Sequence, residues 1–406
     1  MNCRHCQRPL VHKFVDLGSP PPSNAYIEPQ KIDQPEDTFP LRVYVCKHCW
    51  LVQTDDFVQA EKLFSASYAY FSSTSSSWLS HAANFVEKII RRQNLDRQSF
   101  VVEIASNDGY LLKNFVQAEI PCLGIEPTSA TASAARELKI PVLERFFGEE
   151  LARELVNSGK TADLIIGNNV LAHVPDINDF VAGLNKLLKP EGIITMEFPH
   201  LQKLIEFNQF DTIYHEHFSY LSLHAVMTIF NHADLTIFDV DEITTHGGSL
   251  RIYACKKEMA KTQMPNVSKI MTWEKEMGLT DLNTYTSFQF KIEKIKNDLL
   301  LFLKDLKQNG VSVAGYGAAA KGNTLLNYAN INTDLLPCIY DAAPSKQGRF
   351  MPGSKIPIYP PARLQTHQPD YLIIFPWNIK TEIQQQLAFL KHTKFVIAVP
   401  SLTVLS

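Results

Sequence analysis

The chain has 406 residues, of which 45% are hydrophobic and 20% charged, and its 39 basic and 42 acidic residues give a formal net charge of −3. This composition is that of a folded globular protein, and the length allows two or three domains. The near-neutral balance argues against a dedicated nucleic-acid binder. No apolar run is long enough to span a membrane, and the N-terminus lacks the apolar core of a secretory signal, so we expect a cytoplasmic protein without membrane contact.

Two C-x-x-C pairs stand near the N-terminus, Cys3 with Cys6 and Cys46 with Cys49. A two-residue gap allows both thiolates of a pair to reach one tetrahedral ion, so this spacing predicts a zinc site. Because four cysteines already close the site, no position remains for a catalytic water. We therefore expect structural Zn²⁺ that supports folding.

The segment between the cysteine pairs is rich in proline and is predicted to be a long loop that adds little to the core. "RVYVCKHCWLVQT" then predicts a strand, a zinc knuckle and a second strand. A serine-rich stretch follows and passes into a helix near Trp78, with Tyr68 and Tyr70 just before it. From the residues alone, these two tyrosines are either core aromatics or residues of a site.

From Phe100 onward, strands and helices alternate. "FVVEIASNDGYLLKNF" predicts a buried strand, a polar turn and a helix, and "IPCLGIEPT", "DLIIGNNVLAHV" and "GIITMEFP" predict three further strands. This alternation indicates a parallel sheet, whose ligands lie at the carboxyl ends of the strands. The polar residues at those ends are Ser106, Asn107, Asp108, Glu126, Asn168 and Glu197.

The first turn of this sheet contains Gly109 alone and departs from the G-x-G-x-x-G pattern of dinucleotide binders. Glu126, at the end of the second strand, stands where a carboxylate binds the hydroxyls of a ribose, although a solvated loop acid is the alternative. A ribose without a phosphate suggests S-adenosylmethionine. Phe146 and Phe147 either stack on the adenine or fill the core. The predicted cofactor site comprises Glu103, Ser106, Asn107, Asp108, Gly109, Glu126, Pro127, Phe147 and Asn168.

A second α/β unit is predicted after residue 250. "YTSFQFKIEKIKNDLLLFLKDLKQNG" reads as one long helix ending at Gly310, "VSVAGYGAAAKGNTLLNY" as strand, tight turn and helix, and "YLIIFPWN" as the final strand. The glycines and the helix start suit an anion, with simple packing as the alternative. In "IYDAAPSKQGRFMPGSKIPIYPP", a strand is followed by a loop that carries Lys346 and Arg349, two basic residues that suit a diphosphate. The candidate substrate residues are Gly315, Tyr316, Gly317, Lys321, Gly322, Asn323, Asp341, Lys346, Arg349 and Asn378.

The cysteine pairs, "EIASNDGYLL", "YHEHFSYLS", "THGGSLR" and "GYGAAAKGNTLLN" follow one another over nearly the whole chain. In this the sequence resembles the sugar C-methyltransferases that act on nucleotide-linked ketosugars. The resemblance implies an α/β protein with a zinc-binding module, a class I (Rossmann-like) methyltransferase domain and a C-terminal Rossmann-like domain that helps to bind the nucleotide sugar. We place these domains at residues 1–66, 67–255 and 256–406.

The resemblance also implies roles for the titratable residues. His217 would be the base, with Tyr214 and Glu216 around it and with His173 and Tyr68 also in the active site. A carbon next to a ketone loses a proton only to a positioned base, and the resulting enolate needs donors at its oxygen. Neutral histidine can accept that proton near pH 7. His173 and a tyrosine are candidate donors, and Glu216 either orients a histidine or binds a sugar hydroxyl.

The expected reaction is methylation by S-adenosylmethionine of a carbon next to the ketone of a nucleotide-linked 4-keto-6-deoxy sugar, as in branched deoxysugar biosynthesis. Carbon 3 is the favoured position, although either carbon flanking a 4-ketone is open. The expected carrier is thymidine or guanosine diphosphate (dTDP or GDP). We expect a monomer with no nucleic-acid partner.

Other interpretations remain open at this point. The His-Glu-His run could bind a metal or could be structural, although H-E-x-H differs from the helical H-E-x-x-H motif. His246 and Arg251 belong either to a loop bordering the site or to a simple hairpin turn. The chain could also be a zinc-ribbon RNA methyltransferase, which predicts a basic face, or a noncatalytic assembly module, which predicts no cofactor binding.

Overall fold

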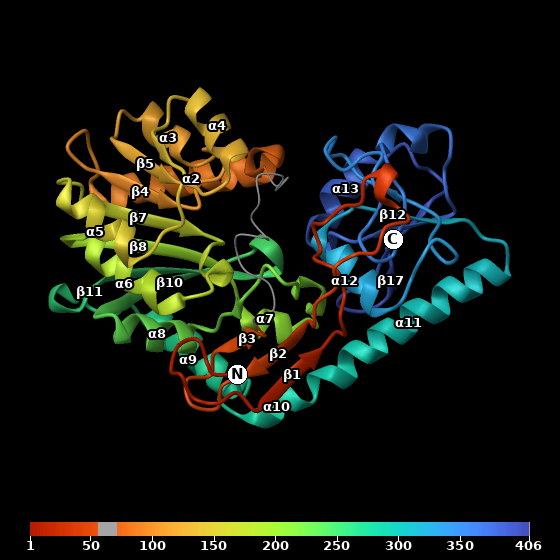
Figure 1. The fold of residues 1–406 in the computed structure, drawn as a ribbon, viewed down its shortest axis with the longest axis horizontal. Helices are drawn as coiled ribbons and strands as arrows, with labels where there is room; N and C mark the ends of the chain where they lie inside the picture. The colour runs from red at the N-terminus through yellow and green to blue at the C-terminus, as the bar shows by residue number, and fades with distance from the viewer. Residues whose placement is uncertain (56–70, 406) are drawn as a thin grey trace.

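The computed structural model describes residues 1–55 and 71–405, which contain three β-sheets. A small N-terminal sheet lies at the base of the molecule, between a larger α/β unit and the C-terminal α/β unit (Figure 1). Within the described residues, no helix combines the length and the apolarity that crossing a bilayer requires.

The N-terminal sheet is antiparallel and takes its last strand from a distant part of the chain. Its strand order is β1-β2-β3-β9, with β1 (His12–Asp16), β2 (Arg42–Val45), β3 (Val52–Thr54) and β9 (Ser219–Tyr220). The predicted strand, knuckle and strand are therefore confirmed as β2 and β3. Because β9 begins two residues after His217, the sheet is joined directly to the polar run of that region.

The larger unit has a seven-stranded sheet, in which β11 alone runs antiparallel to both of its neighbours. In the order β10-β11-β8-β7-β4-β5-β6, its strands are β10 (Leu235–Ile243), β11 (Ser249–Lys256), β8 (Leu188–Pro199), β7 (Ala162–Asn168), β4 (Val101–Ile104), β5 (Cys122–Ile125) and β6 (Val142–Leu143). Every residue of β4 and β5 is buried, as expected of parallel strands covered on both faces.

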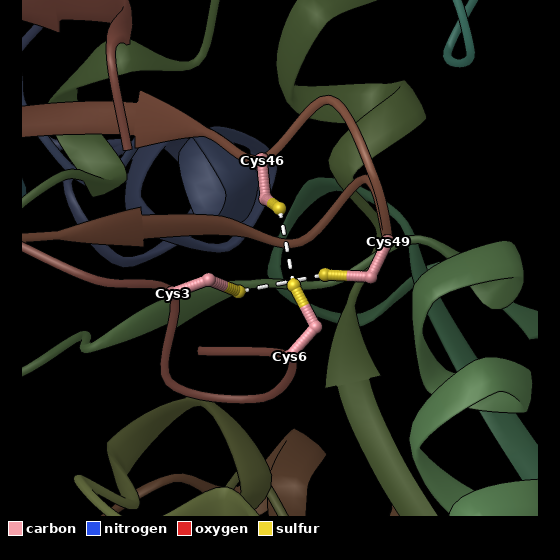
Figure 2. A group of neighbouring side chains, drawn as sticks. All are labelled: Cys3, Cys6, Cys46 and Cys49. Carbon is pink, nitrogen blue, oxygen red and sulfur yellow. Dashed lines mark hydrogen bonds between the residues drawn. The ribbon is translucent and has the colours of Figure 1, made fainter. Parts of the chain in front are cut away.

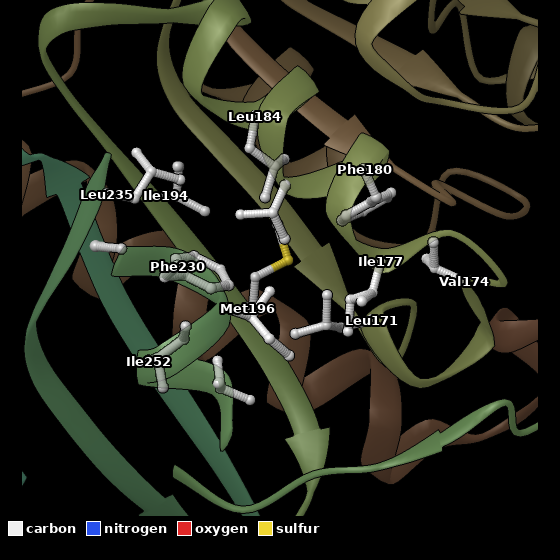
Figure 3. Packing of buried hydrophobic residues seen from close by; sticks show 14 of the residues in the cluster. Leu171, Val174, Ile177, Phe180, Leu184, Ile194, Met196, Phe230, Leu235 and Ile252 are labelled. Carbon is white, nitrogen blue, oxygen red and sulfur yellow. The ribbon is translucent and has the colours of Figure 1, made fainter. Parts of the chain in front are cut away.

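Helices cover both faces of this sheet. On one face, Met196 of β8 packs among side chains that include Leu184 and Phe230 (Figure 3). On the other face, Phe85 belongs to the same cluster as Phe115. The helices of this unit are α2 (Ser76–Gln93), α3 (Leu112–Gln117), α4 (Ser129–Glu137), α5 (Glu149–Asn157), α6 (Ile177–Leu187), α7 (Leu201–Glu206), α8 (Leu223–His232) and α9 (Pro265–Glu276).

The C-terminal sheet is parallel except for its last strand. In the order β14-β13-β12-β15-β16-β17, its strands are β14 (Ile358–Tyr359), β13 (Ile339–Tyr340), β12 (Val313–Tyr316), β15 (Tyr371–Ile374), β16 (Lys394–Ile397) and β17 (Thr403–Val404). The expectation that "YLIIFPWN", which forms β15, would be the final strand is wrong. Only two residues of β16 and none of β17 are buried, so neither strand carries a long apolar run.

The predicted long helix is α11 (Phe288–Gln308), preceded by the separate short helix α10 (Leu282–Thr286). It ends before Gly310, which adopts a φ of 65°. The helix runs from the N-terminal sheet to the C-terminal unit, where α12 (Ala320–Tyr328) and α13 (Lys380–Gln386) lie (Figure 1).

The loop between the cysteine pairs contributes more to the core than its prolines suggest. After β1 it rises beside the C-terminal sheet (Figure 1), where Ile27 and Phe350 exchange backbone hydrogen bonds of 3.0 and 2.9 Å. Tyr26 and Leu41 are buried in one apolar cluster with residues of α11 and of the C-terminal strands, and Ile27 is buried as well. Proline prevents regular structure but does not prevent burial of the side chains around it, so this expectation was wrong.

Candidate active site

A cavity of about 600 Å³ lies at the carboxyl ends of β4, β5 and β7. Its wall combines residues from all three sheet regions, among them Asn24 from the N-terminal loop, Glu126 and His217 from the larger unit and Lys321 from the C-terminal unit. Some residues of each predicted group, for the cofactor, for catalysis and for the substrate, therefore meet at one cavity.

Four of the five predicted catalytic residues line this cavity: His173, Tyr214, Glu216 and His217. The His217 ring lies 4.7 Å from the His173 ring and 4.0 Å from the Tyr214 ring, measured between centroids. The fifth, Tyr68, lies outside the described residues.

Main-chain carbonyls fix the tautomers of the two histidines. The Nδ1 atom of His217 lies 2.8 Å from the Thr212 carbonyl oxygen, and Nδ1 of His173 lies 2.7 Å from that of Glu216. Since a carbonyl only accepts, each Nδ1 carries the hydrogen and each Nε2 has a lone pair in the neutral ring.

Burial keeps both rings neutral. It lowers the pKa of His217 well below the ordinary value and that of His173 to about 4. His217 thus has the form of a base near pH 7. Nε2 of His173 is therefore a hydrogen-bond acceptor, because the single N–H of the neutral ring, at Nδ1, is already donated to Glu216. An enolate oxygen needs a donor, which was the role expected for His173.

The Glu216 side chain faces Asn24, which no sequence pattern marks as a site residue. Its two oxygens each accept a hydrogen bond of 2.8 Å from Nδ2 of Asn24. Burial raises the pKa of Glu216 to about 7, and the Asn24 contact opposes that rise. Among the described residues, no histidine side chain contacts this carboxylate; it is the main-chain carbonyl of Glu216 that accepts from Nδ1 of His173.

On the cofactor side, Glu126 follows β5 and accepts the backbone N–H groups of Asn107 (3.0 Å) and Thr128 (2.9 Å). Asn168, at the end of β7, is buried, and its amide nitrogen and oxygen have no protein partner among the described residues. Pro127 and Phe147 also line the wall.

These groups fit S-adenosylmethionine. The carboxylate of Glu126 suits a ribose diol, the aromatic and apolar wall suits adenine, and the unpaired Asn168 amide suits the amino-acid end.

The other four predicted cofactor residues, Glu103, Ser106, Asp108 and Gly109, do not line the cavity but lie behind its wall. Burial, followed by the charges of Asp108 and Glu126, raises the pKa of Glu103 well above its ordinary value. Asp108 accepts the N–H of Ser73 at 3.0 Å. A Cβ at Gly109 would lie 2.4 Å from Ile140, so this glycine allows the turn to pack closely.

Three predicted substrate residues line the cavity: Lys321, Lys346 and Asn378. Lys321 stands in the first turn of α12, where its Nζ donates to Oδ1 of Asn378 at 2.8 Å. Burial lowers the pKa of Lys321 to about 8, although Asp211 acts against this shift. Lys346 donates to the Ala318 carbonyl at 2.9 Å.

The remaining substrate candidates stand back from the cavity, and packing accounts for the glycines among them. A Cβ would lie 2.7 Å from Phe375 at Gly315, 2.8 Å from it at Gly322 and 2.4 Å from Pro376 at Gly317. The other candidates that do not line the wall are Tyr316, Asn323, Asp341 and Arg349.

The turn between β10 and β11 brings His246 into the wall, whereas Arg251 points to a buried ion pair. Arg251 lies 2.6 Å from Glu197, which also accepts hydrogen bonds of 2.9 Å from His81 and Thr245. The glycines that follow His246 were the only sequence signal for this turn.

The four N-terminal cysteines come together as predicted. Their sulfurs all lie within 4.8 Å of one another and point toward a common centre (Figure 2). The Cys3–Cys49 and Cys6–Cys46 sulfur distances are both 3.5 Å. A tetrahedral ion with Zn–S bonds of about 2.3 Å needs sulfurs about 3.8 Å apart, so these residues fit zinc.

Three family models match successive parts of the chain. They are a zinc binding domain at residues 3–64, a methyltransferase domain at residues 77–240 and a C-methyltransferase C-terminal domain at residues 244–400. The chain is 32% identical to the C-methyltransferase NovU of Streptomyces niveus, over 100% of this chain and 96% of that protein.

Solved structures resemble part of the chain. Magnesium protoporphyrin IX methyltransferase of Synechocystis PCC 6803, with bound SAM, is 15% identical, covers 44% of this chain and 79% of its own, and gives a TM-score of 0.34. The PH0226 protein of Pyrococcus horikoshii OT3 is also 15% identical, covers 50% of this chain and 100% of its own, and gives 0.38.

Proposed function

Because the chain belongs to the C-methyltransferase family, we propose that it methylates a carbon next to the ketone of a nucleotide-linked 4-keto-6-deoxy sugar. The class I methyltransferase fold and the zinc-binding module expected from the sequence are confirmed. The observation that carries the proposal is the neutral His217 ring, with Nε2 available as a base. The ring lies in a cavity that is also lined by the residues proposed to bind the cofactor and an anion.

S-adenosylmethionine supplies a methyl group attached to a positively charged sulfur, which a carbanion attacks. His217 Nε2 takes the proton from the sugar carbon next to the ketone, and the electron pair of that C–H bond delocalises onto the ketone oxygen. The hydrogen bond from Nδ1 to Thr212 holds the ring in place and becomes stronger when the ring is charged. After methyl transfer, the proton on His217 passes to water.

The enolate oxygen requires a hydrogen-bond donor or a positive charge. His173 does not provide one in its neutral form, because its N–H is donated to Glu216. We assign this role to the Tyr214 hydroxyl and the Lys321 ammonium, both from residues that line the cavity. The charge of Lys321 contributes to the low pKa of His217, so the ammonium lies close enough to influence the base. We assign His173 a different role, in which its Nε2 accepts a hydrogen bond from a sugar hydroxyl.

The diphosphate of the substrate would lie near the start of α12. Ala319, Ala320 and Lys321 line the cavity there, and the N-terminus of a helix of 9 residues favours an anion through its free N–H groups and its dipole. Lys346 adds a second ammonium to the same wall. These contacts suit dTDP and GDP equally, since both carry the same diphosphate.

The test is incubation with labelled S-adenosylmethionine and a panel of freshly prepared 4-keto-6-deoxy sugars carried by dTDP and by GDP. We expect one methyl to be added to one panel member, detected by mass, and the methylated carbon to be located by NMR. A protein that binds S-adenosylmethionine but methylates no member of the panel would contradict the proposed substrate class, and methylation of RNA alone would replace it.

A further inference from the structure

Asn24 belongs to the N-terminal loop between the two zinc-binding cysteine pairs, yet its side chain lines the cavity of the larger unit. Its Nδ2 atom lies 2.8 Å from both oxygens of Glu216, which is 192 residues further along the chain. Among the described residues, Asn24 provides the only side-chain hydrogen bond to this carboxylate.

The loop that carries Asn24 is anchored on the C-terminal unit. The Tyr26 hydroxyl donates to the Ala318 carbonyl at 2.6 Å, and Ala318 also accepts from Lys346 of the cavity wall. Ile27 pairs with Phe350 through the backbone, and Lys355 donates to the Ile32 carbonyl at 2.7 Å. These contacts hold the part of the loop that directly follows Asn24 against the C-terminal unit.

The hydrogen bond has a defined electrostatic effect. A donor favours the ionised form of a carboxylate, whereas burial favours the neutral form. Tyr26, two residues after Asn24, is influenced by the charges of Lys346, Asp341 and Glu216. The neutral His173 ring donates to the main-chain carbonyl of Glu216. Without Asn24, burial would act on the carboxylate with less opposition.

We propose that Asn24 is a positioning residue of the methyl-transfer site, which holds the Glu216 carboxylate turned toward the cavity, where it accepts a hydrogen bond from a hydroxyl of the substrate. The zinc-binding module thus contributes a side chain to the active site in addition to its structural role. This inference rests on the proposed function for the nature of the substrate, but the contact itself does not depend on it.

The experiment compares Asn24→Leu, which removes the donor at similar volume, with Asn24→Asp, which places a like charge there. Lys355→Met is the matched control, because it removes a contact between the same loop and the C-terminal unit at an exposed position. The titration of Glu216 is followed by pH-difference infrared spectroscopy of the full chain, with Glu216→Gln assigning the carboxyl band.

Both Asn24 variants should raise the titration midpoint of Glu216, by roughly one to two pH units for Asn24→Leu, as expected for loss of a hydrogen bond to a charged group. The control should leave the midpoint unchanged. With a sugar that the wild type methylates, the acid limb of the pH–rate profile should move to higher pH by the same amount. The rate should fall about tenfold near pH 7 and recover at higher pH.

An unchanged midpoint in a folded Asn24→Leu protein would overturn the inference, as would a rate loss that is equal at every pH. If wild-type protein methylates none of the sugars, the proposed substrate fails, while the infrared titration still decides the role of Asn24. Should Asn24→Leu fail to fold, Asn24→Asp, which retains a polar side chain of equal size, gives the same decision.

Discussion

His217 has the form of a base because of one main-chain contact. The Thr212 carbonyl fixes the hydrogen on Nδ1, and burial lowers the pKa, so that Nε2 is free of a proton across the neutral range. Since the pKa lies below the ordinary value, acidification rather than alkalinisation removes the base. The family resemblance implies which histidine to select, but the tautomer depends on a carbonyl five residues away.

His217→Asn should reduce methyl transfer by about 10²- to 10⁴-fold, the usual contribution of a positioned base. Affinity for S-adenosylmethionine should be retained, as measured by calorimetry. Exchange of the substrate C–H for deuterium in D₂O, without cofactor, should be lost in parallel, because proton removal precedes methyl transfer.

The matched control is His215→Asn. His215 lies two residues earlier, contacts the Phe39 carbonyl at 3.0 Å and does not line the cavity, so its loss should change the rate little. Comparable losses in both variants, or loss of folding in His217→Asn alone, would favour a structural role for the whole run.

At the scale of the elements, the turn after β4 contains a position, Gly109, at which packing against the next helix requires glycine. Gly109 has a φ of 77°, and a Cβ there would lie 3.3 Å from the Cα of Ala135 in α4 as well as 2.4 Å from Ile140. The turn that carries Asn107, whose N–H binds Glu126, therefore depends on close contact with the next helix. A search for phosphate-binding glycines would not detect this constraint.

Gly109→Ala should destabilise the fold by about 2–3 kcal/mol, from backbone strain and overpacking together, and should weaken S-adenosylmethionine binding several-fold. Gly159→Ala is the control, because Gly159 has a φ of 80° but nothing within 4 Å of the added Cβ. It should cost about 1 kcal/mol and leave binding unchanged. Thermal unfolding and calorimetry measure both quantities, and equal binding losses would contradict the argument.

The elements predicted from the sequence are those with strong local patterns. The strand, turn and helix around residues 101–117, the knuckle strands and α11 follow from apolar periodicity and capping. Contacts between residues distant in sequence cannot be predicted from local patterns. The letters "FSY" do not indicate that β9 completes the sheet that contains β1, and the proline-rich loop does not indicate that Asn24 contacts Glu216. Such pairings depend on the assembled fold.

At the scale of the whole molecule, the three regions of the chain share an apolar core. One apolar cluster joins Phe14 of β1, Ile213 and Tyr220 on either side of His217, Leu299 of α11 and Ile358 of the C-terminal sheet. Thr54 of β3 also donates its N–H to the Phe218 carbonyl at 3.1 Å, directly after His217. Disturbance of the zinc site is therefore expected to reach the base.

Cys49→Ser, or removal of zinc with a chelator, should lower the unfolding midpoint by roughly 10 °C, because losing several kcal/mol shifts it by about 2–4 °C per kcal/mol. Methyl transfer should fall more steeply than cofactor affinity, since the pairing of β3 with β9, directly after His217, would be disturbed. Cys338→Ser, outside the cluster, is the control for the thiol itself. Full activity in metal-free protein, with zinc content checked by elemental analysis, would refute this coupling.

The late arrival of β9 has a consequence for synthesis on the ribosome. Strand β3 is complete at Thr54, but its partner begins at Ser219, about 165 residues later. At translation rates of ~5–20 residues per second, the edge of β3 stays unpaired for roughly 10–30 seconds. During that interval the nascent chain presents an open strand next to its thiols, so early capture of the metal and shielding by a chaperone would both improve the yield of native enzyme.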